Sequence, residues 1–359
     1  MQNRSGDQPK LLKIVMRYSI IIVTPSCGKI CLQKAGRGMS NKISAVVPCY
    51  NEQEALPYFL QEIRKVSDEM TAEYGVEFEF LFINDGSADG TLQLLREAAR
   101  TDPRVRYISF SRNFGKEAAI YAGLQGSTGD CVVLMDADLQ HPPAMIKQMY
   151  EAVSEEGYEI AAARRVTRKG EPPIRSFFAR MFYRIINKIS RAEFVDGASD
   201  FRMLSRPAVD AILQVREYNR FSKGIFGWIG FETKWIEYEN VERVAGETKW
   251  SFWKLLLYSF EGIVAFSTAP LSIASVIGII FCIVALLWII VIVIKTLVWG
   301  DPVAGFPTLA CMLLLIGGSI QVSLGIIGQY LAKTYLETKN RPIYIVSETE
   351  KDMKTESSL

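Results

Sequence analysis

Residues 131–143 read CVVLMDADLQHPP, and the interpretation of the chain starts from this stretch. The first five residues are apolar and partly β-branched, as expected for a short strand buried on both faces of a sheet. Asp136 and Asp138 follow at once, and two carboxylates so close together repel each other unless a cation lies between them. The stretch predicts a buried strand over Cys131–Asp136 that delivers acidic side chains to one edge of a sheet.

Short apolar runs of the same kind recur on both sides of this stretch. We expect strands at Ile43–Pro48, Phe78–Asn84, Val105–Ser109 and Glu159–Ala163. Helix-like segments lie between them, at Gln53–Asp68, Gly90–Arg100, Lys116–Gly126 and Pro143–Glu155. Strands that alternate with helices at this spacing indicate βαβ units, and therefore an α/β fold with a Rossmann-like, mostly parallel sheet covered on both faces.

Polar residues follow three of the expected strands, as PCYNE (48–52), NDGSADGT (84–91) and DADLQHPP (136–143). Each string alone is compatible with ordinary turn chemistry, and Ser87 or Asp89 alone with a helix N-cap. Ligands of open parallel sheets bind beyond the carboxyl ends of the strands, where all three strings are expected. Together they predict a binding site at that edge.

The Asp136–Asp138 pair indicates which ligand this edge binds. Oxygen ligands of this kind suit Mg²⁺ or Mn²⁺, ions that usually bridge substrate phosphates. The pattern therefore predicts a nucleotide diphosphate as substrate, with Asp85 accepting hydrogen bonds from its base or ribose.

Composition excludes several other classes of protein. The formal net charge of the 359 residues is only +2, and the first 39 residues hold seven Lys or Arg against the single acid Asp7. The remainder of the chain therefore has 34 basic and 38 acidic residues, which argues against a nucleic-acid partner bound through bulk charge. The six cysteines show no zinc-ligand spacing, so a reducing compartment is expected. The single histidine, His141, argues against a His-rich metal site or a Ser-His-Asp triad.

Residues 1–39 are interpreted as a disordered or non-native leader. Their short apolar run, Ile20–Val23, cannot span a bilayer, and Met39 stands directly before the first expected strand. A transit peptide is the alternative, because basic residues occur there almost without acids.

Two uncharged runs of 25 residues, Pro270–Ile294 and Phe306–Tyr330, predict membrane helices. Each exceeds the roughly 20 residues that cross a hydrocarbon core of about 30 Å. Basic residues gather outside the two runs, at Lys249, Lys254, Lys333, Lys339 and Arg341. The positive-inside rule then places both termini in the cytoplasm, as a multi-pass protein of the inner (plasma) membrane. The alternative is a buried hairpin of a soluble protein.

A basic amphipathic helix is expected over Ile174–Ile189, with Arg180, Arg184 and Lys188 on one flank and Arg175 at the opposite edge. Such helices lie in the membrane interface, although a helix packed on the domain core has the same pattern. A second interfacial segment is expected at Trp250–Leu255. The expected organisation is therefore a catalytic domain (40–248), a juxtamembrane helix (249–268), a transmembrane hairpin (269–332) and a cytoplasmic tail (333–359).

Six strings together resemble a known family: VVPCYNE (46–52), INDGSADGT (83–91), SRNFGKEAAI (111–120), MDADLQHPP (135–143), DGASDFRMLSR (196–206) and GETKWSFWKL (246–255). The chain resembles family 2 glycosyltransferases with the GT-A fold, and among them the polyprenyl-phosphate glycosyltransferases. The resemblance covers roughly residues 42–340, including the paired membrane helices.

The resemblance implies donor-side roles for several residues. Donor-binding positions would be Pro48, Tyr50, Glu52, Asp85, Asp136 and Arg164, of which Asp136 would contact ribose or sugar. Asp138 and Gln140 would hold the divalent metal. Arg243 and Lys249 resemble a basic pair that approaches the phosphates as the site closes, although Arg164 and Arg243 also read as plain surface charges.

On the acceptor side, Asp200 stands where many family members keep an acid, but a role as base is in doubt because some relatives have glycine there. Arg202 would neutralise the acceptor phosphate, and we expect Arg175 to meet the same group. A lipid phosphate is already anionic, so it can attack the anomeric carbon without a general base, and in-line attack inverts that centre.

The expected reaction is therefore inverting transfer of a sugar from a nucleotide donor to a polyprenyl phosphate, with glucose from a uridine-linked donor favoured. Transfer of N-acetylglucosamine, mannose or aminoarabinose to the same lipid stays open. A processive polysaccharide synthase is disfavoured because no Gln-x-x-Arg-Trp string occurs, and a non-enzymatic scaffold or flippase partner because the Asp138–Gln140 ligand set is intact. Two spans make a small anchor, which favours a homo-oligomer.

Overall fold

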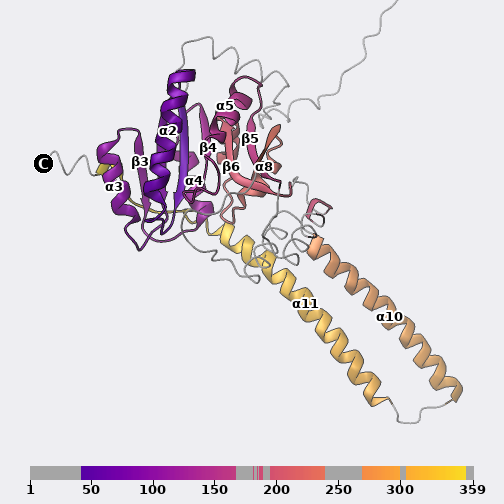
Figure 1. Ribbon diagram of the computed structural model, residues 1–359. Coiled ribbons are helices and arrows are strands. Elements are labelled where there is room, and N and C mark those ends of the chain that lie inside the picture. The colour runs from indigo at the N-terminus through magenta and orange to yellow at the C-terminus, as the bar shows by residue number, and fades with distance from the viewer. Residues whose placement is uncertain are drawn as a thin grey trace, which may run out of the picture. The chain divides into compact units, whose positions relative to one another are not determined.

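The computed structural model describes residues 42–166, 195–238, 269–299 and 305–352, with positions 181, 184 and 186–188 (Figure 1). The leader, most of the amphipathic segment 174–189 and the segment 249–268 lie outside the described residues, as do Arg175, Arg243 and Lys249. Predictions for these residues stay predictions.

An eight-stranded sheet forms the centre of the catalytic domain, in the order β7-β5-β6-β4-β1-β2-β3-β8. Its strands are β1 (Lys42–Cys49), β2 (Glu77–Asn84), β3 (Val105–Phe110), β4 (Cys131–Leu134), β5 (Ile160–Arg165), β6 (Ala198–Ser205), β7 (Thr233–Tyr238) and β8 (Val346–Thr349). β1 pairs in parallel with both β2 and β4, β2 with β3, and β5 with β7. The expected α/β fold with a mostly parallel sheet is confirmed.

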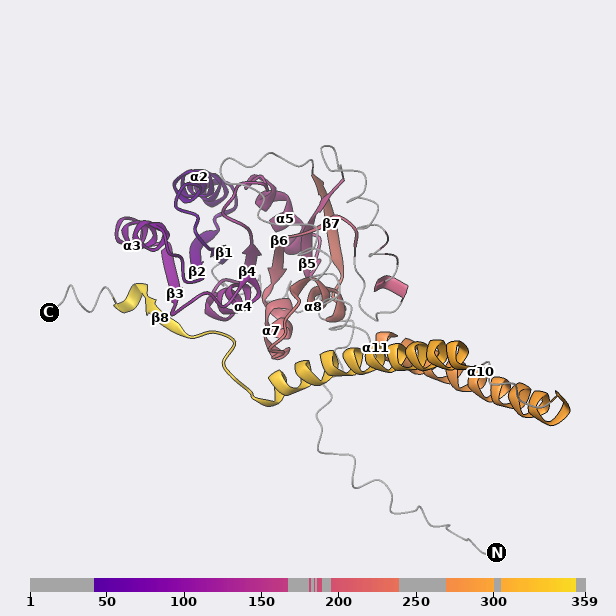
Figure 2. The same cartoon turned by 90° about the horizontal axis from the view of Figure 1, so that it is seen from below.

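Helices cover both faces of the sheet, as Figure 2 shows in a view along its edge. One face carries α2 (Leu56–Tyr74), α3 (Thr91–Thr101) and α5 (Met145–Ser154). The other carries α4 (Lys116–Gly126), α7 (Arg206–Gln214) and α8 (Ser222–Trp228). This arrangement buries both faces of the parallel strands and leaves only their ends open to ligands.

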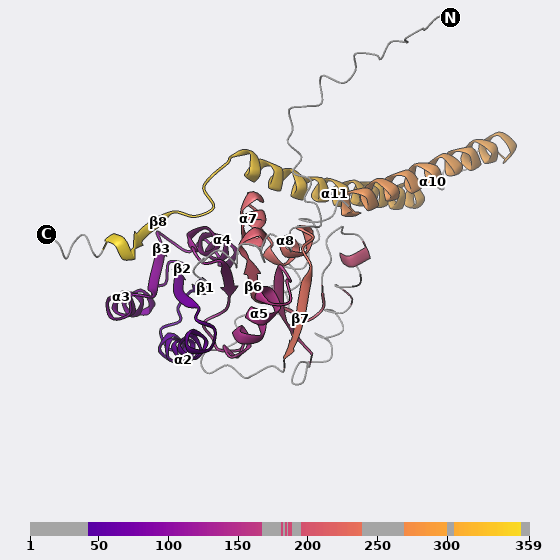
Figure 3. The same cartoon turned by 90° about the horizontal axis from the view of Figure 1, so that it is seen from above.

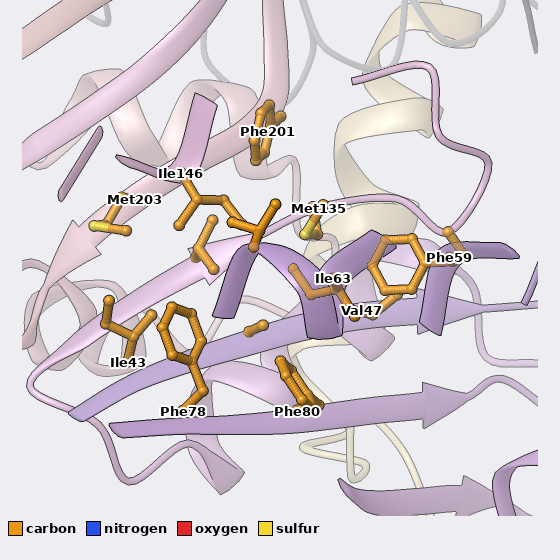
Figure 4. Packing of buried hydrophobic residues seen from close by; sticks show 14 of the residues in the cluster. Ile43, Val47, Phe59, Ile63, Phe78, Phe80, Met135, Ile146, Phe201 and Met203 are labelled. Atoms are coloured by element: carbon orange, nitrogen blue, oxygen red, sulfur yellow. The ribbon is translucent and has the colours of Figure 1, made fainter. Parts of the chain in front are cut away.

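Side chains of β1 alternate between two hydrophobic clusters because successive residues of a strand point to opposite faces. Ile43 and Val47 pack with Phe59 and Ile63 of α2 in one cluster, as Figure 4 shows, whereas Val46 packs with α4 in the other. The α4 helix lies so close to the sheet that a Cβ on Gly123 would come within 2.1 Å of Val46 Cγ1.

Three strands, β6, β7 and β8, were not expected from the sequence, and β7 pairs in parallel with β5 at one edge of the sheet. β6 runs antiparallel between β4 and β5, and β8 adds an antiparallel edge strand beside β3 (Figure 3). β6 contains Asp200 and Arg202, so it lacks a continuous apolar run. β8 is polar and is held by its side chains, because Glu348 pairs with Arg96 and also accepts a hydrogen bond from Tyr107. The expected cytoplasmic tail thus contributes a strand to the catalytic domain.

Both long apolar runs are helical, in α10 (Ala269–Trp299) and α11 (Phe306–Thr338), which lie side by side (Figures 1 and 2). Among the described residues, one stretch, Leu315–Thr338, is long and apolar enough to cross a membrane by length and composition. A shorter apolar stretch covers Pro270–Phe281. One candidate span is therefore found, and the second crossing stays a prediction.

A buried carboxylate at the amino-terminal end of the sheet provides a test of the fold. Glu79 is 3% exposed and accepts hydrogen bonds from Lys42 Nζ (2.8 Å), Ser44 Oγ (2.5 Å) and Thr128 N (2.6 Å). Burial alone would raise the pKa of Glu79, but these hydrogen bonds outweigh it and lower the pKa to about 2. The native state therefore binds the Glu79 proton more weakly than the unfolded chain does.

We expect this difference to stabilise the protein by about 3 kcal/mol at pH above the unfolded pKa of about 4.5, and the gain to disappear as the pH falls toward 2. In thermal unfolding of the full chain, Glu79→Gln should lower Tm at pH 7, and the deficit should shrink as the buffer is acidified from pH 5 to pH 3. The exposed Glu62→Gln is the matched control and should leave Tm unchanged. A Glu79→Gln deficit that is independent of pH would contradict this assignment.

Candidate active site at the carboxyl ends of the strands

The loops after β1 and β2 are joined by reciprocal hydrogen bonds. Asn51 N donates to Ser87 Oγ (3.0 Å), and Ala88 N donates to Asn51 Oδ1 (2.9 Å). Asn51 adopts a left-handed backbone conformation (φ 54°), which asparagine tolerates better than most residues. Two of the three expected polar strings are thereby fixed side by side beyond the strand ends.

Asp85, at the end of β2, organises a third loop. Its carboxylate accepts hydrogen bonds from the backbone N–H groups of Phe114 (2.6 Å) and Gly115 (3.0 Å). The residue is only 3% exposed, and burial raises the pKa of Asp85 despite these bonds. Its oxygens hold the loop that leads into α4, and the expected hydrogen bonds from a base or ribose stay a prediction.

Asp136 and Asp200 face each other across the β4–β6 pair. Leu134 is in register with Arg202, and the same antiparallel register continued by two residues sets Asp136 opposite Asp200. The ammonium of Lys116, the first residue of α4, lies between them, with Nζ 2.8 Å from Asp136 Oδ1 and 2.9 Å from Asp200 Oδ2. A cation is thus found beside the expected carboxylates, and it is a lysine of the chain itself.

These contacts shift the pKa values of Lys116 and Asp200. Burial works against the charged form of Lys116, but the charges of Asp136 and Asp200 outweigh it and raise the pKa of the lysine. Burial likewise opposes the charged form of Asp200, yet Lys116 and Lys223 hold the pKa of Asp200 well below its usual range. A carboxylate whose pKa is lowered in this way is a weaker proton acceptor than an ordinary one.

Asp138 and Gln140 lie in the turn after β4 and are both partly exposed. The residue between them, Leu139, has φ 55°, an unfavourable left-handed conformation for leucine, and Gln140 N donates to Asp138 Oδ1 at 3.2 Å. One carboxylate and one amide oxygen are hard ligands that fit Mg²⁺ or Mn²⁺, provided that substrate phosphates complete the coordination. The described residues include no group of three or more His, Cys, Asp or Glu that could hold a metal ion.

His141 links this turn to the strand that carries Asp200. Its Nε2 lies 2.6 Å from Ser199 Oγ, and its ring packs between Phe201 and Tyr238. Burial outweighs the charges of nearby acids and lowers the pKa of His141, so the ring is neutral at pH 7.

The remaining described candidates lie at different depths. Tyr50 is 45% exposed and Pro48 is half-buried, and both lie where β1 leads into the loop that is hydrogen-bonded to the loop after β2. Arg164 Nε donates to the backbone oxygen of Asp196 at 3.3 Å. Arg202 is only 3% exposed, with its guanidinium stacked over Phe226, so its direct contact with an acceptor phosphate would require Phe226 to move. The positive charge of Arg202 also helps to lower the pKa of Asp200.

Comparison with known proteins agrees with this geometry. The family model described as glycosyl transferase family 2 matches residues 44–213. The putative glycosyltransferase CsbB of Bacillus subtilis is 45% identical over 306 residues, which cover 85% of this chain and 91% of that protein. The prophage bactoprenol glucosyl transferase homolog of Escherichia coli is 39% identical over 310 residues, which cover 86% of this chain and 100% of that protein. The chain belongs to glycosyl transferase family 2.

More distant similarity is found among solved structures. Mannosyl-3-phosphoglycerate synthase from Rubrobacter xylanophilus is 17% identical, with a TM-score of 0.42, and the match covers 67% of this chain and 76% of that one.

The prediction from the sequence did not include Lys116 among the site residues of this family 2 glycosyltransferase. A lysine at the first position of a helix lies at the positive end of the helix dipole, where a cation is unfavourable. Its position directly after Gly115 (φ 96°) and beyond the strand ends was therefore a usable signal of a special role. The structure brings together Lys116, Asp136, Asp200 and, through His141, the Asp138–Gln140 turn.

Proposed function

We propose that this glycosyltransferase transfers glucose from UDP-glucose to a polyprenyl phosphate at the cytoplasmic face of the membrane. The observation that carries the proposal is the acidic edge of a family 2 sheet in a chain that also contains a membrane-length apolar helix. Proteins named bactoprenol glucosyl transferase, such as that of Shigella phage SfX at 40% identity over 305 residues, support this choice of donor sugar and acceptor.

In this proposal, Asp138 and Gln140 would hold a divalent cation, which would supply positive charge against the departing nucleoside diphosphate. Asp136 contacts the ribose or sugar, and Pro48, Tyr50, Glu52 and Arg164 surround the donor. Asp85 lines the same pocket and also holds the loop before α4. Arg243 and Lys249 add positive charge on the diphosphate as the site closes.

The acceptor needs no general base, because a lipid phosphate is anionic at neutral pH. Asp200 accordingly serves as a fixed charge that holds Lys116, not as a proton acceptor. Arg202 adds compensating charge behind Asp200, and Arg175 meets the lipid phosphate from the membrane side. In-line attack by the phosphate oxygen inverts the anomeric carbon.

We propose that α11 is one membrane span and α10 a second, so that both termini are cytoplasmic. α10 is 31 residues long, which at 1.5 Å per residue exceeds the hydrocarbon thickness of about 30 Å, and it exposes large apolar side chains such as Ile279 and Leu287. Glu337 at the cytoplasmic end of α11 accepts hydrogen bonds from the backbone N–H groups of Tyr218 (2.9 Å) and Asn219 (3.0 Å). This contact joins the anchor to the loop that precedes α8. A homo-oligomer fits so small an anchor.

A donor panel tests the proposed function. Purified full-length protein is incubated with undecaprenyl phosphate and radiolabelled UDP-glucose, UDP-N-acetylglucosamine, GDP-mannose or UDP-aminoarabinose, with and without a chelator. We expect label in the lipid phase from UDP-glucose, and loss of that signal on chelation with recovery when Mn²⁺ or Mg²⁺ is restored. If another donor is preferred, the proposed sugar is wrong but the proposed reaction class stands. If transfer continues in the presence of the chelator, the proposed metal requirement is wrong.

A further inference from the structure

We infer that Lys116 binds the phosphate of the acceptor lipid, and that Asp136 and Asp200 hold its ammonium in place for that contact. This inference rests on the proposed function and adds a residue to the acceptor side of the same site. It starts from the position of Lys116 between a residue expected on the donor side and a residue expected on the acceptor side.

The ammonium has hydrogen-bonding capacity left over. A lysine ammonium carries three N–H donors, and the hydrogen bonds of Nζ go to Asp136 (2.9 Å) and Asp200 (2.9 Å), with no third partner among the described residues. The side chain of Lys116 is 45% exposed, which leaves it open to an approaching ligand. The two carboxylates fix the direction of this donor, because each accepts one of the other two.

Other described cations beside Asp200 are less suited to this contact. Arg202 is 3% exposed and stacked on Phe226, so it contributes charge without reaching a ligand. Lys223 is half-buried, and it acts on Asp200 through its charge. These two cations offset the negative charge of the carboxylates, which would otherwise repel an incoming phosphate, and Lys116 is left as the exposed donor in direct contact with both acids.

The donor diphosphate is a weaker candidate for the same contact. In the proposed function its negative charge is met by the cation on Asp138 and Gln140 and by Arg243 and Lys249. The acceptor phosphate must instead approach from the side of Asp200, where Lys116 offers an exposed hydrogen-bond donor. Placing one ammonium between the two substrates also reduces the repulsion between their anions.

The experiment measures donor and acceptor kinetics separately with a short-chain polyprenyl phosphate and UDP-glucose. For Lys116→Met we expect kcat/KM for the acceptor to fall by about 10- to 100-fold, as for the loss of a charge-assisted hydrogen bond, while the donor KM stays within about twofold. Lys116→Arg keeps a cation and should retain more acceptor efficiency than Lys116→Gln. Lys147→Met is the matched control, because Lys147 is an ion-paired lysine of α5 that bonds Glu73, and it should leave both substrates unaffected.

UDP binding without acceptor shows whether the site is intact in each variant. If Lys116→Met no longer binds UDP, the comparison of Lys116→Arg with Lys116→Gln decides, and equal acceptor KM values in the two would overturn the inference. So would a donor KM in Lys116→Met that rises as much as the acceptor KM. If the wild-type protein transfers no sugar to any polyprenyl phosphate, the proposed function itself fails, whereas normal acceptor kinetics in Lys116→Met remove only the role of Lys116.

Discussion

Asp138→Asn should lower kcat/KM for sugar transfer by about three orders of magnitude, because it removes the only carboxylate proposed to hold the cation against the departing diphosphate. The Asp138 side chain is partly exposed and asparagine has nearly the same size, so the substitution leaves no cavity and the protein should still fold. The concentration of Mn²⁺ that gives half-maximal activity should rise at the same time.

The control for this substitution lies at the other end of the same strand. Asp130 precedes β4 and accepts a hydrogen bond from Lys42 N at 3.2 Å, far from the acidic edge. Asp130→Asn should leave kcat/KM and the Mn²⁺ dependence within about twofold of wild type, as is usual for a surface substitution. Equal activities of the Asp138 and Asp130 variants would show that the turn after β4 does not hold a catalytic cation.

Gly86→Ala should both destabilise the protein and reduce transfer about 100-fold. Gly86 has φ +63°, and a Cβ there would lie 2.4 Å from Arg112 C and 2.6 Å from Asn113 N, so the backbone of that loop must shift. The same loop continues into Phe114 and Gly115, which Asp85 holds, and then into Lys116. A displacement of about 1 Å at a positioned catalytic group is enough for an effect of this size.

Gly75→Ala separates backbone strain from the shift of the loop. Gly75 ends α2 with φ +67°, close to that of Gly86, but its Cβ would meet nothing within 4 Å. We expect Gly75→Ala to cost about 1 kcal/mol of unfolding free energy with full activity, and Gly86→Ala to cost about 3 kcal/mol. Chemical denaturation and steady-state kinetics of both variants check this. Equal activity losses in the two would contradict the placement of Lys116 by this loop.

The strands were predictable where apolar residues ran without interruption. β1, β2, β3 and the start of β4 fall where the sequence places them, and α4 has the predicted bounds. β6 was missed because two charged residues, Asp200 and Arg202, interrupt its apolar pattern, and both become acceptable only through partners from other elements. β8 was missed because its stabilisation comes from an ion pair between Glu348 and Arg96, 252 positions away in the chain.

The site was predictable only in the parts that are local in sequence. Asp136, Asp138 and Gln140 follow one strand, so the periodicity alone brings them to the sheet edge. The contact of Lys116 with Asp200 depends on the antiparallel register of β6 against β4, which no local pattern encodes. For Asp85, the position at the end of a strand was predicted, but its hydrogen bonds with Phe114 and Gly115 were not.

The most direct test of the account compares two acceptors that differ only in the phosphate. Purified full-length protein is given UDP-glucose with either undecaprenyl phosphate or undecaprenol, and the glycolipid formed is quantified by mass. In the proposed mechanism the acceptor is an anion that needs no general base and is bound by the ammonium of Lys116. We therefore expect product with undecaprenyl phosphate and none with undecaprenol. Comparable transfer to undecaprenol would contradict the account, because the site would then have to activate a neutral hydroxyl.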